Sequence, residues 1–460
     1  MVLIKSISGV RGTIDNNDIG GLSSIAIKDS VEQYTFWIKN EYNLENNFIV
    51  IGRDGRVSGK KILSIVSNVL INLNVNVVNL NLTTTPSVQM AVISENCIGG
   101  IMVSASHNPI NWNGLKFLNR EGEFLTKKQS DSLYSIEKKI FKNLKEISLN
   151  SSENNLDYSE IHISSILKLT DIKIDFIKKR KFKIVVDGIN SSGGIYVPLL
   201  LEKLGVDVIK LNCIPDGNFA HNPEPLPKNL SELSKLVVSE KADLGIAVDP
   251  DVDRLVFVCE DGSFFGEEYT IVAIANYLLS YKKGNTVCNL SSSNALKDIT
   301  ILNGGNHFYS PVGEANVVSL MKEKKAIFGG EGSGGVIFPD LHYGRDALVG
   351  IALFLSYLSL ESIKTSELKD RLPKYYMLKE KITVSKDFNL DYFNSKCQYF
   401  FNDISNIIFI DGVRINFNCN SWVHIRKSNT EPIIRIISES SSEEKANKFI
   451  KDVIKNLKNI

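Results

Sequence analysis

The chain has 460 residues, of which 43% are hydrophobic and 23% charged, and its formal net charge is +1. These proportions are those of an ordinary globular protein, and the length predicts about three or four domains. The nearly neutral charge argues against nucleic acid and anionic membranes as partners, because neither would be attracted by the protein as a whole.

The cysteines and the apolar runs indicate an intracellular globular protein. The six cysteines have no metal-ligand spacing, which predicts reduced, buried thiols and a cytoplasmic location. They are Cys97, Cys213, Cys259, Cys288, Cys397 and Cys419. The first residues, MVLIKSISGVRGT, meet charge and glycine too early for a secretory signal. Residues 349–360 form the longest apolar run, which is shorter than the about 20 residues of a membrane span and predicts a buried helix.

Strand-like apolar runs alternate with helical patterns along the chain, which predicts α/β units. Residues 47–56 and 181–190 both contain an apolar run followed by Asp-Gly, and residues 242–254 end another run in aspartates. The recurrence suggests related modules without proving a repeat. Ligands of α/β folds bind where such strands end, so these segments are the first candidates for a site.

Two helices have clear start signals. Thr126 and Gln129 form a capping box, and Ser441 with Glu444 forms another close to the end of the chain. The apolar face of the first helix is predicted to contain Leu133, Ile136, Ile140 and Leu144. The stripe of the second is predicted to contain Ala446, Phe449, Ile450, Val453, Ile454 and Leu457.

Domain boundaries are predicted from changes in composition. Residues 147–160 are polar and poor in apolar side chains, as linkers are. After residues 372–376 the pattern changes to short strands, which indicates a different C-terminal domain. A third boundary is expected near Asp261.

The segment VSASHNPINWNG, residues 103–114, sets a polar, turn-forming loop after an apolar strand. A hydrolase nucleophile at Ser106 would need a G-x-S-x-G turn, which is absent. His107 is adjacent in sequence and cannot easily swing back onto the Ser106 hydroxyl. Taken alone, a segment of this kind is most often a structural loop.

The segment DPDVDR places Asp249, Asp251 and Asp253 at alternate positions, from which three carboxylates can converge on a cation. Such hard oxygen ligands suit Mg²⁺. A calcium EF-hand is excluded because its sixth position requires glycine and is Arg254 here. An acidic surface turn is the alternative, although Arg254 directly after the acids favours an anion beside the metal.

Two further loops carry groups that suit a phosphorylated sugar. Residues 329–339 are rich in glycine and offer Glu331 and Ser333 to sugar hydroxyls. Residues 426–435 offer the donors of a phosphate site, although an ordinary hairpin turn is possible. These donors are Arg426, Ser428, Asn429, Thr430 and Arg435.

In this order the four motifs resemble those of the α-D-phosphohexomutases, from SGVRGT (8–13) to RIISE (435–439). The resemblance implies three related α/β domains and a smaller C-terminal α+β domain around a central cleft. The domains are expected at residues 1–152, 153–258, 259–372 and 373–460.

The resemblance also implies a reaction. Ser106 would be a phosphoserine that passes its phosphoryl group to a hexose 6-phosphate and recovers another from the hexose 1,6-bisphosphate, which leaves hexose 1-phosphate. Mg²⁺ would be held by the three aspartates and an oxygen on Ser106. Positioning and charge neutralisation dominate phosphoryl transfer, so these groups make chemical sense.

The same resemblance implies roles for the remaining residues. Arg254 and Arg11 would add positive charge, and Lys116 would act as general acid or base with His107 near the serine. Glu331, Ser333 and the loop containing Gly313 would hold the sugar. The loop from Arg426 to Arg435, including Ser428, Asn429 and Thr430, would hold the phosphate that is not reacting.

One position departs from the pattern. Many members have a histidine, a proposed participant in proton transfer, where this chain has Gly335. His342 or Arg345 could compensate, or Lys116 could suffice.

The sequence resembles bacterial phosphoglucosamine mutases most, with phosphomannomutase/phosphoglucomutase as the alternative substrate preference. A catalytically disabled phosphosugar-binding protein and a metal-dependent phosphatase are the alternatives from other classes. A small phosphosugar is the expected partner, and the protein is expected to be a monomer or homodimer.

Overall fold

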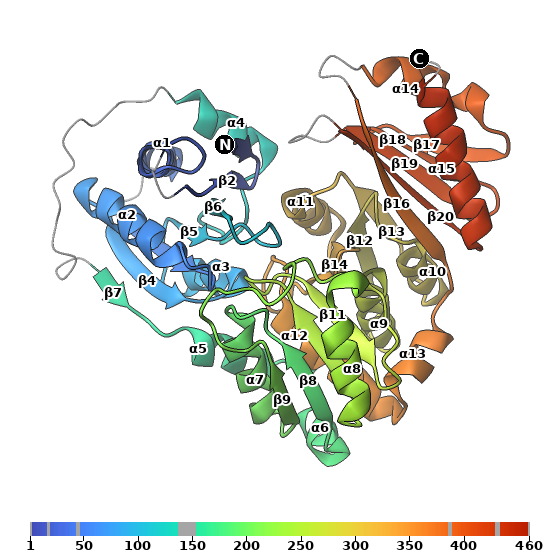
Figure 1. The fold of residues 1–460 in the computed structure, drawn as a ribbon, viewed down its shortest axis with the longest axis horizontal. Coiled ribbons are helices and arrows are strands. Elements are labelled where there is room, and N and C mark those ends of the chain that lie inside the picture. The colour runs from blue at the N-terminus through green and yellow to red at the C-terminus, as the bar shows by residue number, and fades with distance from the viewer. Residues whose placement is uncertain are drawn as a thin grey trace. The chain divides into compact units, whose positions relative to one another are not determined.

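The computed structural model describes residues 2–15, 19–42, 47–136, 153–384, 389–427 and 433–458 (Figure 1). The chain divides into two compact units. The first contains Met1–Thr270 and Ser333–Lys369, and the second contains Ile271–Gly332 and Asp370–Ile460.

The first unit begins with a seven-stranded sheet in the order β1-β2-β6-β5-β3-β4-β7. Its strands are β1 (Leu3–Ser6), β2 (Gly9–Thr13), β3 (Phe48–Arg53), β4 (Asn76–Leu82), β5 (Gly99–Val103), β6 (Trp112–Leu118) and β7 (Glu153–Asn155). The helices of this part are α1 (Ser24–Tyr42), α2 (Gly59–Asn72), α3 (Thr85–Ser94) and α4 (Lys127–Ser135). Strands β5, β3, β4 and β7 are parallel, whereas β6 runs antiparallel to β5.

The second sheet of this unit has the order β11-β10-β8-β9. Its strands are β8 (Lys183–Asp187), β9 (Asp207–Leu211), β10 (Leu244–Val248) and β11 (Leu255–Cys259). Its helices are α5 (Ser159–Leu167), α6 (Ile174–Arg180), α7 (Gly193–Lys203) and α8 (Ser231–Ser239), with a 3-10 turn at Pro227–Asn229. Strand β15 (Gly335–Ile337) and helix α12 (Ala347–Glu361) also belong to the first unit, and α13 (Thr365–Arg371) begins in it.

The second unit contains the parallel strands β14, β12 and β13, in that order, and a five-stranded antiparallel sheet. The parallel strands are β12 (Asn285–Asn289), β13 (His307–Ser310) and β14 (Ala326–Glu331). The antiparallel sheet, in the order β16-β20-β19-β18-β17, consists of β16 (Tyr376–Thr383), β17 (Ile404–Ile408), β18 (Val413–Phe417), β19 (Trp422–Lys427) and β20 (Ile433–Ser440). The helices are α10 (Asn294–Leu302), α11 (Glu314–Lys324), α14 (Asp391–Phe400) and α15 (Glu443–Lys458), and α9 (Glu267–Leu279) leads into the unit.

One strand order occurs three times. In chain order, the first strand of each set lies between the third and the second, as in β5-β3-β4, β10-β8-β9 and β14-β12-β13. In the first two sets an antiparallel fourth strand, β6 or β11, follows the third. The modules that the sequence suggested are therefore present, and the predicted α/β class is confirmed.

The loop after the third strand carries the predicted chemistry in all three sets. Ser106 lies between β5 and β6, the three aspartates lie between β10 and β11, and Ser333 lies between β14 and β15. The same connection therefore supplies the serine, the carboxylates and the sugar-binding candidate.

The two predicted helix starts have different outcomes. The capping box of Thr126 and Gln129 is present in both directions, but α4 ends at Ser135 and Ile136 is extended. Ile140 and Leu144 lie outside the described residues. At α15 the first turn is bonded by Ser442 instead of Ser441, because the Lys445 amide donates to Ser442 Oγ at 3.3 Å.

The apolar stripe predicted for α15 is confirmed. Ala446, Ile450, Val453 and Leu457 are buried, and Phe449 and Ile454 pack against the same core. Side chains at this spacing share one helix face, which α15 packs against the antiparallel sheet (Figure 1).

The six cysteines are all free thiols. The prediction of buried thiols is wrong for Cys419, which is exposed, and Cys213 is only half-buried. Cys419 lies in the turn between β18 and β19, where its side chain faces solvent.

Helix α12 is buried along residues 347–359, as its apolar sequence predicts. Within the described ranges, no single helix has the length and apolar character needed to cross a membrane. Helices α12 and α13 meet that test only as a pair, with a bend of 89° between them.

A buried polar cluster joins the start of α10 to the antiparallel sheet of the second unit. Glu439 on β20 accepts hydrogen bonds at Oε1 from the Asn294 amide (2.8 Å) and Trp422 Nε1 (2.7 Å). Arg414 donates to Asn294 Oδ1 at 2.7 Å, and its guanidinium lies 4.0 Å from the Trp422 ring centre. Glu439 Oε2 is buried without a hydrogen-bond partner among the described residues. Burial raises the pKa of Glu439 to about 7.

This raised pKa predicts that the unit loses stability as the pH rises. Between the ordinary pKa of a glutamate and about 7, the folded state keeps a proton that the unfolded chain releases. The free energy of unfolding therefore falls through this window, by up to about 3 kcal/mol. Glu439→Gln should remove most of the decrease, as measured by urea unfolding at pH 5 and pH 8. An equal pH dependence in the variant and the wild type would contradict the assignment.

Candidate active site

Three carboxylates gather at the end of β10. Every residue of this strand is buried, so the chain enters the loop from the core and carries Asp249, Asp251 and Asp253 into it. All three side chains are fully buried, and one oxygen from each lies within 4.8 Å of the others. Among the residues described, this is the group of acidic, histidine or cysteine side chains placed to hold a metal ion.

Each carboxylate has at least one oxygen that is bound by the protein. Asp249 Oδ1 accepts from the amides of Asp253 and Arg254 at 3.0 and 3.1 Å. Asp251 Oδ2 accepts from Lys116 Nζ and Thr85 Oγ1. Asp253 Oδ2 accepts from Arg345 Nη2 at 2.7 Å and from Lys116 Nζ at 3.1 Å.

The other oxygens of Asp251 and Asp253 have no partner. Oδ1 of each is buried and receives no hydrogen bond from the described part of the chain. Buried oxygens without a partner carry a substantial cost, which a bound cation would remove. Hard carboxylate oxygens are ligands that Mg²⁺ prefers, so this donor set fits that ion.

The charges in the cluster shift the pKa values of its individual groups. Burial, followed by the nearby Asp253 and Asp251, raises the pKa of Asp249 well above its usual range. Burial acts in the same direction on Asp253, but Arg345 and Lys116 outweigh it and lower the pKa of that carboxyl. For Lys116, burial disfavours the charged form, yet Asp251 and Asp253 raise its pKa. Lys116 is therefore an ammonium held between two carboxylates.

Ser106 faces this cluster from the first sheet. Its Oγ donates to Asp249 Oδ2 at 2.7 Å, and its amide donates to Ser104 Oγ at 2.8 Å. The backbone at Ser106 is left-handed, with φ of 49°, a conformation that is uncommon for residues other than glycine. The side chain is 2% exposed. The structure thus brings the predicted serine and the predicted metal ligands together.

Arg56 fixes the serine loop in this conformation, and the sequence analysis missed it. Its guanidinium bonds Asp54 Oδ2 and four carbonyl oxygens, including that of Ser106 at 2.6 Å and that of Asn108 at 2.7 Å. The side chain is fully buried. The only sequence signal was an arginine just after the Asp-Gly turn that follows β3.

Three more predicted residues lie around Ser106. His107 Nδ1 is 3.4 Å from Ser106 Oγ, and burial together with Arg254 and Arg11 holds the pKa of His107 well below its usual range. Arg11 donates to Asn108 Oδ1 at 3.3 Å. Arg254 pairs loosely with Glu224, at 3.9 Å, and its Nε is buried without a partner among the described residues. The site therefore presents a neutral imidazole and two guanidinium groups to an anion.

The second unit brings together Glu331, Gly313 and Asn289. Glu331 Oε1 accepts from Asn289 Nδ2 at 2.8 Å and from the Gly313 amide at 2.9 Å. The Val312 amide donates to Asp411 Oδ2 at 3.0 Å, which ties this loop to the antiparallel sheet. The Gly313 amide is thus bound to Glu331.

Arg426 and Arg435 lie directly opposite each other on β19 and β20. Like charges at opposed positions repel unless an anion lies between them. Burial lowers the pKa of Arg426, with Asp411 opposing, and its Nε has no partner in the described ranges. The other predicted members of this loop, Ser428, Asn429 and Thr430, lie outside the described residues.

The residue after Ser333, Gly334, contacts the strand that follows the aspartate loop. The Leu255 amide, at the start of β11, donates to the carbonyl of Gly334 at 3.0 Å. His342 Nε2 contacts Asp346 Oδ2 at 3.3 Å. That carboxylate also contacts His162 Nε2, at 2.8 Å, and caps α12. His342 therefore bonds the carboxylate that caps α12.

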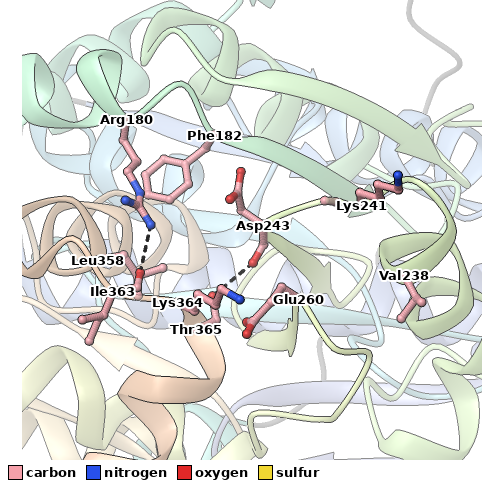
Figure 2. Close-up of a pocket in the computed structure, with 11 residues that line it drawn as sticks. Arg180, Phe182, Val238, Lys241, Asp243, Glu260, Leu358, Ile363, Lys364 and Thr365 are labelled. Carbon is pink, nitrogen blue, oxygen red and sulfur yellow. Dashed lines mark hydrogen bonds between the residues drawn. The ribbon is translucent and has the colours of Figure 1, made fainter.

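A cavity of about 300 Å³ in the first unit is remote from this chemistry (Figure 2). Arg180, Phe182, Asp243 and Glu260 line it, where β8 and β10 begin. Asp249 lies past the other end of β10. Glu260 accepts from the amide and hydroxyl of Ser366, so its carboxylate is already occupied. The carboxyl ends of the strands, and not this cavity, carry the site.

Comparison with known proteins supports the assignment that the fold and the carboxylate cluster suggest, a phosphohexomutase. The models of phosphoglucomutase/phosphomannomutase α/β/α domains I, II and III match residues 4–144, 160–262 and 266–376. The model of the C-terminal domain matches residues 366–456. The chain belongs to the phosphoglucomutase/phosphomannomutase family, whose members are isomerases that act as intramolecular phosphotransferases.

Two curated relatives span nearly the whole chain. The phosphoglucomutase/phosphomannomutase of Thermococcus kodakarensis is 36% identical over 457 residues, covering 97% of this chain and 96% of that protein. The phosphoglucosamine/phosphogalactosamine mutase of Sulfurisphaera tokodaii is 31% identical over 458 residues, covering 97% of each. These relatives have different named substrates at comparable identity, so they establish the reaction class and leave the sugar open.

Solved structures share the fold. A phosphoglucomutase/phosphomannomutase family protein from Burkholderia thailandensis has a TM-score of 0.83 at 24% identity, covering 99% of this chain and 98% of that chain. N-acetylphosphoglucosamine mutase of Aspergillus fumigatus, in complex with GlcNAc-6P and magnesium, has a TM-score of 0.53 at 13% identity, covering 89% of this chain and 82% of that one.

Arg56→Lys should disable the serine loop. A lysine ammonium cannot bond a carboxylate and four carbonyls at once, so Ser106 would lose its fixed position. We expect turnover to fall about 100-fold, since small misplacements of reacting groups have effects of that size. Steady-state kinetics measures the loss, and the exposed Arg120→Lys is the matched control. Full activity in Arg56→Lys would show that the loop holds its shape without the guanidinium.

Asp251→Asn should weaken cation binding, because it replaces a buried carboxylate by a neutral amide. Titration with Mn²⁺, followed by electron paramagnetic resonance, should show affinity at least about tenfold lower. Asp131→Asn, at an exposed position on α4, should bind as the wild type does. Equal affinity in the two variants would exclude the triad as the metal site.

Proposed function

We propose that this protein interconverts glucosamine 6-phosphate and glucosamine 1-phosphate through a phosphoserine at Ser106 and a 1,6-bisphosphate intermediate. The observation that carries the proposal is the Ser106 hydroxyl, bonded to Asp249 inside the buried carboxylate cluster. The alternative is a phosphomannomutase/phosphoglucomutase preference, since relatives with both names match the chain.

Asp249, Asp251 and Asp253 would hold Mg²⁺ together with an oxygen on Ser106. When bound, the ion supplies positive charge to the transferring phosphoryl group. The two buried oxygens without partners on Asp251 and Asp253 support this role, because they are available while the other oxygen of each is occupied.

In the forward direction the bond between Ser106 Oγ and phosphorus breaks, and phosphorus bonds to O1 of the sugar. The proton of the O1 hydroxyl leaves to a base, and the serine oxygen takes up a proton as it leaves. Lys116, charged between its carboxylates, suits the proton donor, and the neutral His107 suits the acceptor. Arg254 and Arg11 stabilise the charge on the phosphoryl oxygens.

The second half-reaction is a transfer in the opposite direction, from the sugar to Ser106, and it uses the phosphate at O6. The 6-phosphoryl group of the bisphosphate returns to Ser106, which leaves the 1-phosphate. Both ends of the sugar must therefore be held in turn. Glu331, Ser333 and the Gly313 loop would bind sugar hydroxyls, and the opposed Arg426 and Arg435 would bind the idle phosphate.

Phosphorus NMR with Mg²⁺ and a trace of hexose 1,6-bisphosphate tests the reaction and the sugar. Glucosamine, glucose and mannose 6-phosphates are offered separately, and we expect the 1-phosphate signal to grow fastest from glucosamine 6-phosphate. Ser106→Ala should lose at least about 1,000-fold in turnover, because it removes the group that carries the phosphoryl. Ser132→Ala, at an exposed position on α4, is the control.

Each other outcome selects a different function. Faster turnover of glucose or mannose phosphate would replace the substrate and keep the mechanism. Release of free phosphate that persists in Ser106→Ala would indicate a phosphatase. Binding of sugar phosphates without turnover would indicate a catalytically disabled binding protein.

A further inference from the structure

A side chain at Gly335 would collide with the side chain of Arg345. A Cβ atom placed on Gly335 would lie 2.3 Å from Arg345 Cδ and 3.1 Å from its Cγ. The backbone at Gly335 does not require glycine, since Gly335 is not among the glycines with positive φ. What requires glycine is therefore the space that Arg345 occupies.

Arg345 is brought to this place by the segment that follows β15. Ile337 and Arg345 form an antiparallel bridge, and the Asp346 amide donates to the Val336 carbonyl at 2.8 Å. The segment thus returns alongside β15, and the Arg345 side chain crosses Gly335. It ends at the carboxylate cluster, where Nη2 donates to Asp253 Oδ2 at 2.7 Å with the side chain 10% exposed.

This contact decides which way Asp253 faces. Asp253 Oδ2 is held by Arg345 and Lys116, whereas Oδ1 is buried without a partner in the described ranges. A carboxylate has two equivalent oxygens, so an anchor on one of them directs the other. Asp251 is held in the same way through Oδ2 by Thr85 and Lys116.

We propose that Arg345 is a positioning residue, which anchors Asp253 so that its second oxygen faces the cation, and that Gly335 exists to leave room for it. The proposal rests on the proposed function. Arg345 would not itself take part in proton transfer, because a guanidinium does not give up its proton near neutral pH. Proton transfer therefore falls to other groups of the site.

Four variants test the proposal: Arg345→Ala, Arg345→Lys, Gly335→Ala and the double variant Gly335→Ala with Arg345→Ala. Arg345→Ala should lower kcat about 10- to 100-fold with KM for the sugar phosphate within about threefold, as expected for a residue behind a metal ligand. Arg345→Lys, which keeps a cationic donor, should recover part of kcat. Arg120→Ala, at an exposed arginine, is the control.

The glycine gives the decisive comparison. Gly335→Ala should displace the Arg345 side chain and so reproduce the loss seen in Arg345→Ala. The double variant should be no worse than Arg345→Ala alone, because the group that the methyl displaces is already absent. Losses that multiply in the double variant would overturn the proposal.

Mn²⁺ binding provides a readout that does not depend on turnover. Arg345→Ala and Gly335→Ala should each bind Mn²⁺ about tenfold more weakly than the wild type, since Asp253 loses its anchor. Tighter binding would mean that Arg345 acts only as a repelling charge, and unchanged binding would mean that it does not position Asp253; either outcome contradicts the proposal. A wild type that binds Mn²⁺ but turns over no sugar phosphate would refute the proposed function and leave the binding comparison readable.

Discussion

The first unit depends on keeping three carboxylates buried side by side. Transfer of a charged group into the interior costs several kcal/mol even after relaxation, and like charges add repulsion. The protein offsets this cost with Lys116 from β6 and Arg345 from the segment after β15, which both bond into the cluster. Segments distant in sequence must therefore meet at the end of β10. These contacts, together with the apolar cores, constrain how the segments of the first unit are arranged.

Two loops of the candidate site also contain residues in unfavourable backbone conformations. Ser106 has φ of 49°, and Val252, inside the aspartate loop, has φ of 62°. A β-branched residue with positive φ is a genuine outlier, and such strain persists only where the surroundings impose it. For Ser106 the imposing group is Arg56, which bonds the carbonyls on both sides of the loop tip. The strained backbone conformation of Ser106 therefore depends on the hydrogen bonds from Arg56.

Much of this site could be predicted from sequence because its groups are clustered in short motifs. The three alternating aspartates, with EF-hand geometry excluded by Arg254, predicted that three carboxylates gather in one place, and the motif order predicted the family and the α/β fold. Arg56 and Thr85 could not be found in this way, because they act through contacts with residues about 50 and 166 positions away. Local sequence signals also failed to predict where a helix ends. The capping box started α4 as expected, but nothing local indicated that Ile136 would be extended.

The surroundings of Gly335 show a related limit of prediction from the sequence. The sequence offered both His342 and Arg345 as substitutes for a missing histidine, and spacing could not separate them. In the structure His342 turns toward Asp346 at the start of α12, whereas Arg345 reaches Asp253. Two residues three positions apart thus have unrelated partners, because the returning segment directs them to different neighbours.

The threefold recurrence of one strand order has an evolutionary consequence. Duplicated modules inherit the same connection after the third strand, and a connection outside the sheet can change without altering strand pairing. In this chain the connection of one copy contains Ser106, that of the second contains the three aspartates, and that of the third is rich in glycine. Under the proposed function the third copy holds the sugar, so a change in that loop alone would alter the choice of sugar and leave the other two loops intact. Substrate preference should therefore vary among descendants far more readily than the reaction itself.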